Sequence, residues 1–195
     1  MCNNVSYIWY VGYGSNLDQQ RFYCYIQGGR PKYGHVKDPG CSNRILPLRS
    51  QSIRIPYKLY FAPINKRAYS NNWGAGGVAF LEPEATTNPN DWTLGRMWRI
   101  TRDQYEEIRD KEGRKSYDKE IPLGAKDNIS ICTITNSRRL ENSVGPSENY
   151  IKTIVSGLLE TYQMPNPEIV NYLINKAGIN GNYTEEQLLG IIGEL

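Results

Sequence analysis

Apolar runs with strand-like spacing alternate with runs of helical spacing along the chain, which predicts a mixed α/β body. Residues 6–13 are rich in Tyr, Ile, Trp and Val and predict the first strand. Alternating or continuous apolar runs predict further strands over 53–62, 74–83, 92–100 and 129–135. Pro56 lies within the first of these runs and indicates an edge strand or a bulge.

Two segments between the strands have helical spacing. From Leu17 to about Ile26, one helical face collects the apolar residues Leu17, Phe22, Tyr25 and Ile26. Thr101 opens a second helix, because Gln104 follows it in capping-box spacing, and Gly113 provides a natural stop.

The C-terminal part of the chain, from Pro146 onward, is predicted to be helical. Pro146-Ser147 starts a strongly amphipathic helix. Further helices begin at Asn166-Pro167 and at Thr184. The segment Gln163-Met164-Pro165 is the candidate boundary between the mixed α/β body and a helical tail.

The length of 195 residues suits one domain, 1–195, with a core of about 6–162 and a helical C-terminal appendage of about 166–195. Apolar residues make up 39% of the chain and charged residues 22%, which is typical of a soluble globular protein. No apolar run approaches the roughly 20 residues of a membrane helix. The opening residues MCNNVSYIWY show no signal-peptide pattern, so the expected location is the cytoplasm.

The number and spacing of histidines and cysteines limit the kinds of metal site, disulfide and catalytic group that the chain can form. His35 is the single histidine and lies in a turn-rich segment, so we interpret it as a surface residue. The four cysteines are scattered without a C-x-x-C pair, which matches neither a disulfide framework nor a zinc ribbon. We therefore expect no metal, and in an enzyme the proton carrier would be a carboxylate, a lysine or a tyrosine.

The formal net charge is +3, and the positive residues are unevenly distributed. Between Arg21 and Arg67, basic residues far outnumber acidic ones, and Asp38 is the one acidic residue. Such a stretch could contact nucleic acid or an anionic small substrate. Its Arg and Lys residues are dispersed rather than clustered, which favours a solvated face.

The tripeptide Gly14-Ser15-Asn16 stands where the first strand gives way to a helix. Backbone N–H groups at such a turn, together with the positive potential of a helix start, bind carboxylates and phosphates. The alternative is an ordinary tight turn that caps the helix and contacts no ligand.

Glu112, in "RDKEGRKSY", lies at the end of the predicted Thr101 helix. The helix dipole disfavours an anion at this end, which suits a general base that works near neutral pH. The alternative is a solvated glutamate at a frayed helix end.

A family resemblance joins these two features. The segments "VGYGSNL", "LYF", "WGAGGVAFLEP", "LGRMWRI", "RDKEG" and "PSENY" resemble, in order, the gamma-glutamyl cyclotransferase family. That family carries a Y-G-S-N-L loop followed by a D-x-x-E-G segment. The resemblance runs from about Tyr7 to Tyr162, which is most of the chain.

The resemblance implies a fold and a reaction. The fold would be a small, partly closed mixed β-barrel with flanking helices and a cavity at one end, of class α+β. In the reaction, the α-amine of a gamma-glutamyl compound attacks its own side-chain carbonyl, which yields 5-oxoproline and a released amine or amino acid. Neither a cofactor nor a metal is required.

The resemblance also implies site residues. Glu112 would be the catalytic acid and base, with its proton transfers at the attacking and leaving nitrogens. The residues that would bind the substrate are Tyr13, Gly14, Ser15, Asn16, Leu17, Tyr117 and Tyr150.

The sequence departs from the family pattern in several places. The family's aspartate falls on Arg109, while Asp110 is two residues from Glu112 and would face elsewhere on the helix. Tyr117-Asp118-Lys119 stands where relatives often have Tyr-x-Arg. Trp73 either lines the cavity or closes a turn onto the core. These departures leave the identity of the substrate open.

Three functions follow as hypotheses: a cyclotransferase, a non-catalytic member of the same fold that binds a small metabolite or a protein, and a nucleic-acid-associated protein. Glu112 favours the first over the second, and the absence of a nucleic-acid motif counts against the third. The expected partner is a small gamma-glutamyl compound, with neither nucleic acid nor a membrane as a partner. A homodimer remains an open alternative.

Overall fold

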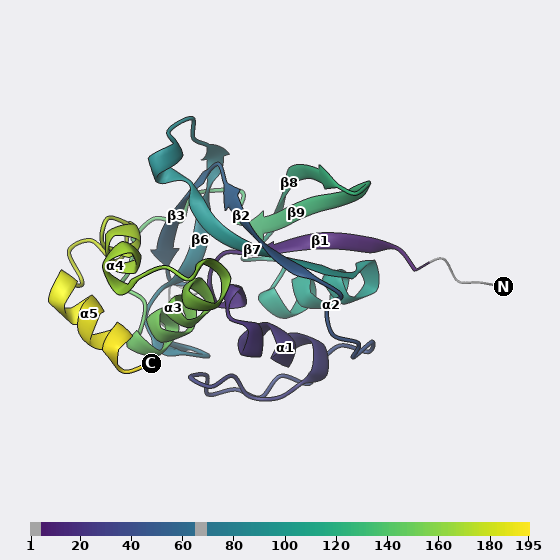
Figure 1. The fold of residues 1–195 in the computed structure, drawn as a ribbon, viewed down its shortest axis with the longest axis horizontal. Coiled ribbons are helices and arrows are strands. Elements are labelled where there is room, and N and C mark those ends of the chain that lie inside the picture. Colours follow the sequence, from purple (N-terminus) through teal and green to yellow (C-terminus); the bar gives the residue numbers. More distant parts are fainter. Residues whose placement is uncertain (1–4, 65–69) are drawn as a thin grey trace.

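The computed structural model describes residues 5–64 and 70–195. The architecture is mixed α+β, in agreement with the predicted class (Figure 1). The strands are β1 Tyr7–Gly12, β2 Ser50–Ile55, β3 Tyr57–Ala62, β4 Ser70–Asn71, β5 Gly74–Ala75, β6 Val78–Ala85, β7 Thr93–Thr101, β8 Lys119–Lys126 and β9 Ile129–Thr135. The α-helices are α1 Gln19–Gln27, α2 Arg102–Glu112, α3 Glu148–Tyr162, α4 Asn166–Ile174 and α5 Glu185–Gly193, and short 3-10 turns occur at Ser15–Leu17 and Pro89–Asp91.

The main sheet has five strands in the order β2-β7-β1-β9-β8. Strand β1 lies at its centre, antiparallel to β7 and parallel to β9. Residues 8–12 are all buried, which explains why this strand is apolar without a break rather than alternating. The centre of the sheet therefore leads directly into the Gly14-Ser15-Asn16 turn.

The described strands do not close into a barrel. Beside the main sheet, β3 pairs with β6 and β4 pairs with β5 as separate two-stranded sheets. The Thr135 hydroxyl joins β9 to β6, because it donates to the Leu81 carbonyl (2.7 Å) and accepts from the Leu81 N–H (3.0 Å). A side chain thus bridges two strands that a continuous barrel would join through their backbones.

The predicted strand over 53–62 is two strands in the structure. Pro56 separates β2, an edge strand of the main sheet, from β3, which pairs with β6. Because proline has no N–H to donate, it suits the point at which the chain leaves one sheet for another.

Strand β8 was not predicted. It contains Pro122 and Gly124, and its register shifts between Pro122 and Ala125. It also forms the outer edge of the main sheet. An edge strand exposed to solvent needs no apolar alternation, so the sequence carries little signal for it.

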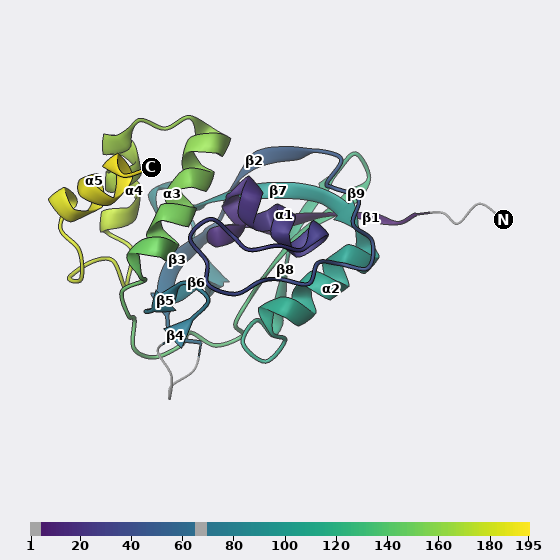
Figure 2. The same ribbon diagram turned by 90° about the horizontal axis from the view of Figure 1, so that it is seen from below.

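The predicted helices are present, with one change at the first. Helix α1 begins after Asp18, whose side chain accepts from the Arg21 N–H (2.6 Å), and Leu17 belongs to the preceding 3-10 turn. Helix α2 has the predicted capping box between Thr101 and Gln104. Both helices lie on the same side of the main sheet (Figures 1 and 2).

The C-terminal helices gather at the end of the molecule opposite the start of β1 (Figure 2). Helices α4 and α5 bury Ile169, Leu173 and Leu188 in the same core cluster as the sheet. The Phe61 N–H of β3 donates to the Ala177 carbonyl (2.8 Å), which ties this tail to the small sheet.

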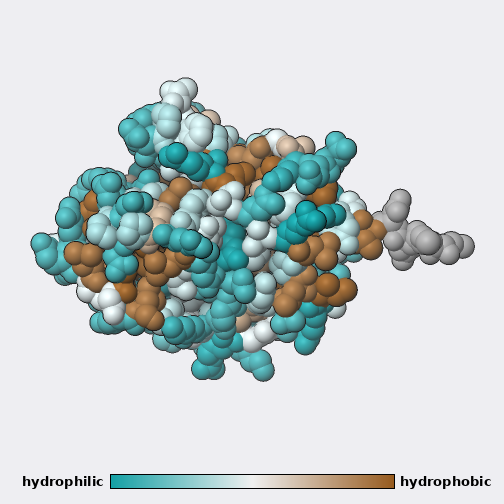
Figure 3. All heavy atoms as spheres, viewed as in Figure 1, coloured by the Kyte–Doolittle hydropathy of each residue, from teal (hydrophilic) through white to brown (hydrophobic). Residues whose placement is uncertain are grey.

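Polar side chains cover much of the face seen in Figure 3, with hydrophobic patches over the C-terminal helices and beside the start of β1. The second patch adjoins a small hollow lined by the exposed Val5, Ile45 and Leu48. Of the helices described, none is both long enough and apolar enough to cross a bilayer.

Candidate active site

The Tyr13–Leu17 loop forms a tight turn between β1 and α1. The Leu17 N–H donates to the Gly14 carbonyl (3.1 Å). A Cβ at Gly14 would lie 2.8 Å from both the Ala79 Cβ and the Tyr150 hydroxyl, so this position needs glycine because of close approach.

Interactions from the sheet and from α3 hold this loop in place. The Trp98 indole N–H donates to the Asn16 carbonyl (2.9 Å), and Arg96 Nη1 donates to the Leu17 carbonyl (3.2 Å). Arg96 also forms an ion pair with Glu160 of α3 (2.8 Å). A Cβ at Gly157 would lie 2.4 Å from the Leu17 Cβ, so α3 packs closely against the loop.

Glu112 meets this loop from the C-terminal end of α2. The Asn16 side-chain amide donates to Glu112 Oε1 at 2.7 Å and to the Tyr10 hydroxyl at 3.2 Å. The carboxylate is half-buried. Asn16 Oδ1 is buried and has no hydrogen-bond partner in the described part of the chain, so it can accept a hydrogen bond from a ligand.

Two tyrosines adjoin the carboxylate. Burial raises the pKa of Tyr10 well above its usual value, and the Glu112 charge raises it further. Burial also raises the pKa of Tyr25; the nearby Arg21 charge opposes this rise and the Glu112 charge adds to it. Both hydroxyls therefore stay protonated at neutral pH.

A small inner cavity of about 30 Å³ lies between the loop and Glu112. The Tyr117 hydroxyl donates to the Ala79 carbonyl (3.0 Å), and the Tyr150 hydroxyl accepts from the Ala79 N–H (3.2 Å). The Tyr13 hydroxyl donates to the Ile134 carbonyl (2.8 Å). The structure thus brings three predicted tyrosines to one cavity, where the backbone fixes their hydroxyls.

A larger outer cavity of about 350 Å³ adjoins the inner one. Both cavities are lined by Ser15, Glu112, Tyr117 and Tyr150. The outer one is also lined by Arg21, Tyr25 and Trp73. The Trp73 ring lies 5.6 Å from that of Tyr150, so Trp73 both lines the cavity and packs on the core.

Leu17, the last residue of the predicted loop, is fully buried and lines neither cavity. Its side chain belongs to the core, where it packs under α3, so it supports the loop rather than facing the cavity.

Of the charged residues on α2 near Glu112, Lys111 lines the outer cavity, whereas Arg109 and Asp110 line neither cavity. Asp110 is exposed and paired with Arg114. Arg109 lies 3.5 Å from Glu120. His35 is exposed, and the described residues contain no cluster of His, Cys, Asp and Glu that could hold a metal ion.

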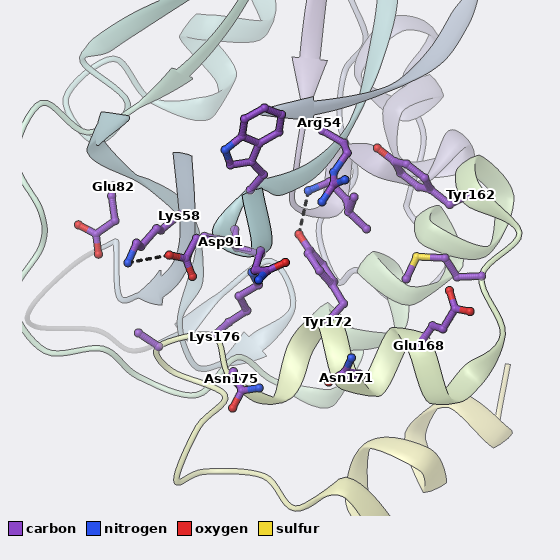
Figure 4. Close-up of a pocket in the computed structure, with 16 residues that line it drawn as sticks. Arg54, Lys58, Glu82, Asp91, Tyr162, Glu168, Asn171, Tyr172, Asn175 and Lys176 are labelled. Atoms are coloured by element: carbon purple, nitrogen blue, oxygen red, sulfur yellow. Dashed lines mark hydrogen bonds and ion pairs between the residues drawn. The ribbon is translucent and has the colours of Figure 1, made fainter. Parts of the chain in front are cut away.

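The largest described cavity, of about 1010 Å³, lies elsewhere, between α4 and the β2, β3 and β7 strands (Figure 4). The Tyr172 hydroxyl accepts from the Leu94 N–H (3.1 Å), and Lys58 pairs with Asp91 (3.0 Å). These polar groups already have partners within the chain, and none of the predicted site residues lines this cavity.

The basic stretch between Arg21 and Arg67 forms no single surface in the described part of the chain. Arg21 is buried, whereas Arg44 is exposed and donates to the Pro39 carbonyl (3.3 Å). Lys66 and Arg67 lie outside the described residues.

The sequence did not single out several residues of this site. Arg21 lines the outer cavity, Tyr10 and Tyr25 contact the Asn16–Glu112 pair, and Arg96 holds the loop. Tyr25 was predicted to lie on an apolar helix face. Helical periodicity placed it inward correctly, but periodicity does not reveal where a hydroxyl points.

Comparisons with known proteins give two kinds of match. No protein-family model matches the sequence. Histone deacetylase 5 of Arabidopsis thaliana is 34% identical over 116 residues, which cover 60% of this chain and 17% of that protein. The chain thus spans a small part of that relative, and the match carries no argument about activity.

Two solved structures match nearly the whole chain. A structure of a gamma-glutamyl cyclotransferase has a TM-score of 0.58 at 20% identity and covers 97% of this chain and 100% of its own. A crystal structure of an uncharacterized protein from Homo sapiens has a TM-score of 0.55 at 21% identity and covers 96% of this chain and 99% of its own. The chain therefore has the gamma-glutamyl cyclotransferase-like fold.

Proposed function

We propose that this protein is a gamma-glutamyl cyclotransferase that converts a gamma-glutamyl compound into 5-oxoproline and a free amine or amino acid. The observation that carries the proposal is the 2.7 Å contact between Glu112 and Asn16 at a cavity between the Tyr13–Leu17 loop and α2. A carboxylate that can carry a proton, Glu112, thus lies beside a turn of the kind whose backbone N–H groups bind anions.

Glu112 takes a proton from the substrate's α-ammonium group in the first step. The free amine then attacks the γ-carbonyl carbon, a C–N bond forms, and a five-membered ring closes. Glu112 returns that proton to the leaving nitrogen as the original amide C–N bond breaks, and the second proton lost by the ring nitrogen passes to the released amine, which leaves as an ammonium. The reaction needs neither an oxidant nor an external nucleophile.

The other residues bind and orient the substrate. Asn16 Oδ1 is an available acceptor for the α-ammonium group. Backbone N–H groups of the Tyr13–Leu17 loop would stabilise the glutamyl carboxylate or the developing oxyanion. Because ring closure is intramolecular, holding the reactive conformer and moving protons from the attacking nitrogen to the leaving nitrogen account for most of the catalytic task.

A product assay tests this function. The protein is incubated with gamma-glutamyl amino acids, gamma-glutamyl amines and glutathione, and 5-oxoproline is measured together with the released amine. We expect equal amounts of the two products from at least one substrate. The N-acetylated form of that substrate is the control, because its blocked nitrogen cannot attack.

Two results would contradict the proposal. Absence of 5-oxoproline across the panel would favour a non-catalytic binding protein of the same fold. Turnover of the N-acetylated control would show that another nucleophile attacks the carbonyl.

A further inference from the structure

Arg21 is a buried cation that the proposed proton transfers do not use. It lies in the first turn of α1 and lines the outer cavity that Glu112 also lines. It is only 6% exposed. Its guanidinium carbon lies 3.7 Å from the centroid of the Tyr25 ring, so the charged group sits over an aromatic wall of the cavity.

The guanidinium group of Arg21 forms no side-chain hydrogen bond or ion pair with the described residues, and its Nε is both buried and unpartnered. Burying a charge without a partner costs several kcal/mol. Stacking on Tyr25 offsets about 2 kcal/mol of that cost when the pair is desolvated, but it satisfies none of the N–H groups. The site therefore has unused capacity to bind an anion.

The charged residues near Arg21 do not pair with its guanidinium group. Lys111 already donates to the Tyr25 carbonyl and to Asp38 Oδ1, each at 2.8 Å. Asp38 is therefore neutralised by Lys111 rather than by Arg21. Glu112 lines the same cavity and its charge helps to raise the pKa of Arg21, but no ion pair joins the two side chains in the described part of the chain.

We propose that Arg21 binds a carboxylate group of the substrate through its guanidinium fork. The inference rests on the proposed function for the identity of that substrate. Arg21 donors and the Asn16 Oδ1 acceptor together match the opposite charges of an amino acid. The carboxylate is that of a leaving amino acid in the outer cavity or the α-carboxylate of the glutamyl group.

Two substrates that differ by one carboxylate distinguish these sources. Gamma-glutamyl-alanine carries a carboxylate on its leaving group, and gamma-glutamyl-ethylamine lacks it. If Arg21 binds the leaving group, Arg21→Gln raises KM for the alanine compound by about 10- to 100-fold and leaves the ethylamine compound unchanged. If it binds the α-carboxylate, KM rises for both.

Matched variants separate binding from structure. Arg21→Lys keeps the charge but loses the fork, so we expect part of the affinity to return. Arg30→Gln removes the same charge from an exposed position just after α1 and should leave KM unchanged. Unchanged KM in Arg21→Gln for both substrates, or a loss confined to kcat, would overturn the inference.

A binding experiment keeps the inference testable without turnover. Calorimetry measures the affinity for glutarate, a dicarboxylate, and for glutaramide, its neutral counterpart. We expect glutarate binding that weakens in Arg21→Gln, whether or not 5-oxoproline forms. Glutarate affinity equal in the parent and the variant, or absent from the parent, would overturn the role of Arg21 and leave the product assay to decide the reaction.

Discussion

At the residue scale, the proposed proton carrier is the Glu112 carboxylate, and substitution of this residue tests the proposal. Glu112→Gln keeps the size of the side chain and an oxygen that accepts from Asn16, but it removes the titrating group. Loss of general acid–base catalysis costs about 10²- to 10⁴-fold, so we expect kcat to collapse. The melting temperature should equal or exceed that of the parent, because the α2 dipole disfavours an anion there.

Glu106→Gln is the matched control for that experiment. Glu106 lies on the same helix, and its carboxylate forms an ion pair with Arg114 (2.7 Å) at the surface. Surface pairs contribute about 0–1 kcal/mol, so activity should be retained. Parental kcat in Glu112→Gln would show that Glu112 is not the proton carrier, and unfolding of that variant would show that its role is structural.

The sequence could predict the site residues that belong to a recognisable motif. It could not predict the other residues that contact them in the folded protein. Glu112 and the Tyr13–Leu17 loop stand in recognisable segments, and the structure brings them within 2.7 Å of one another. Arg21 follows the loop by four residues and carried no signal of its own. The Arg21 charge becomes buried only in the folded protein, where the Tyr25 and Trp73 rings lie against it.

At the element scale, the approach of α3 to the 3-10 turn depends on one glycine. A Cβ at Gly157 would lie 2.4 Å from the Leu17 Cβ and 2.5 Å from the Asp18 backbone nitrogen. Because backbone atoms cannot move aside, we expect Gly157→Ala to lower the free energy of unfolding by about 1–3 kcal/mol. Thermal unfolding measures this change, and kcat should fall with it, since the turn carries Asn16.

Gly190 provides the opposite case within α5. A Cβ at this position would have no heavy atom within 4 Å, so Gly190→Ala should raise the unfolding free energy by about 0.5–1 kcal/mol. Equal effects at the two glycines would show that helix propensity, rather than close packing against the loop, sets the cost at Gly157.

Helices and strands can be predicted from the sequence where their buried side chains recur with helical or strand periodicity. Helix α2 has the capping box that its sequence predicts, and β9 has the predicted bounds, Ile129–Thr135. Strand β8 lacks such a pattern because it is a solvated edge. Pro56 indicates an edge or a bulge but not a change of sheet, because a local pattern does not tell which of two sheets a strand will join.

At the scale of the whole molecule, buried tyrosines link stability to alkaline pH. Burial raises the folded-state pKa above its ordinary value of 10.0 in Tyr10, Tyr13, Tyr25, Tyr117 and Tyr150. Below about pH 10, all of them are protonated in both states and stability is unaffected. Above it, the unfolded chain loses these protons first, so each tyrosine lowers the unfolding free energy by up to about 1.4 kcal/mol per pH unit.

A spectroscopic titration checks this dependence. Tyrosinate absorbance should rise in a cooperative step that coincides with loss of circular dichroism, because these hydroxyls ionise only when the protein opens. The chain in concentrated guanidinium is the control and should titrate gradually around pH 10. Gradual titration of the native protein without unfolding would show that the tyrosines reach solvent.

The contact between Asn16 and Glu112 joins residues 96 positions apart in the chain, and the contact between Ala79 and Tyr150 joins residues 71 positions apart. Helices form through neighbours in sequence, whereas contacts of such separation require the chain to close long loops first. Turnover would therefore report complete folding: as the protein refolds from denaturant, helical signal should return before 5-oxoproline release does. The proposed site would therefore be assembled only after segments far apart in the sequence have come into contact.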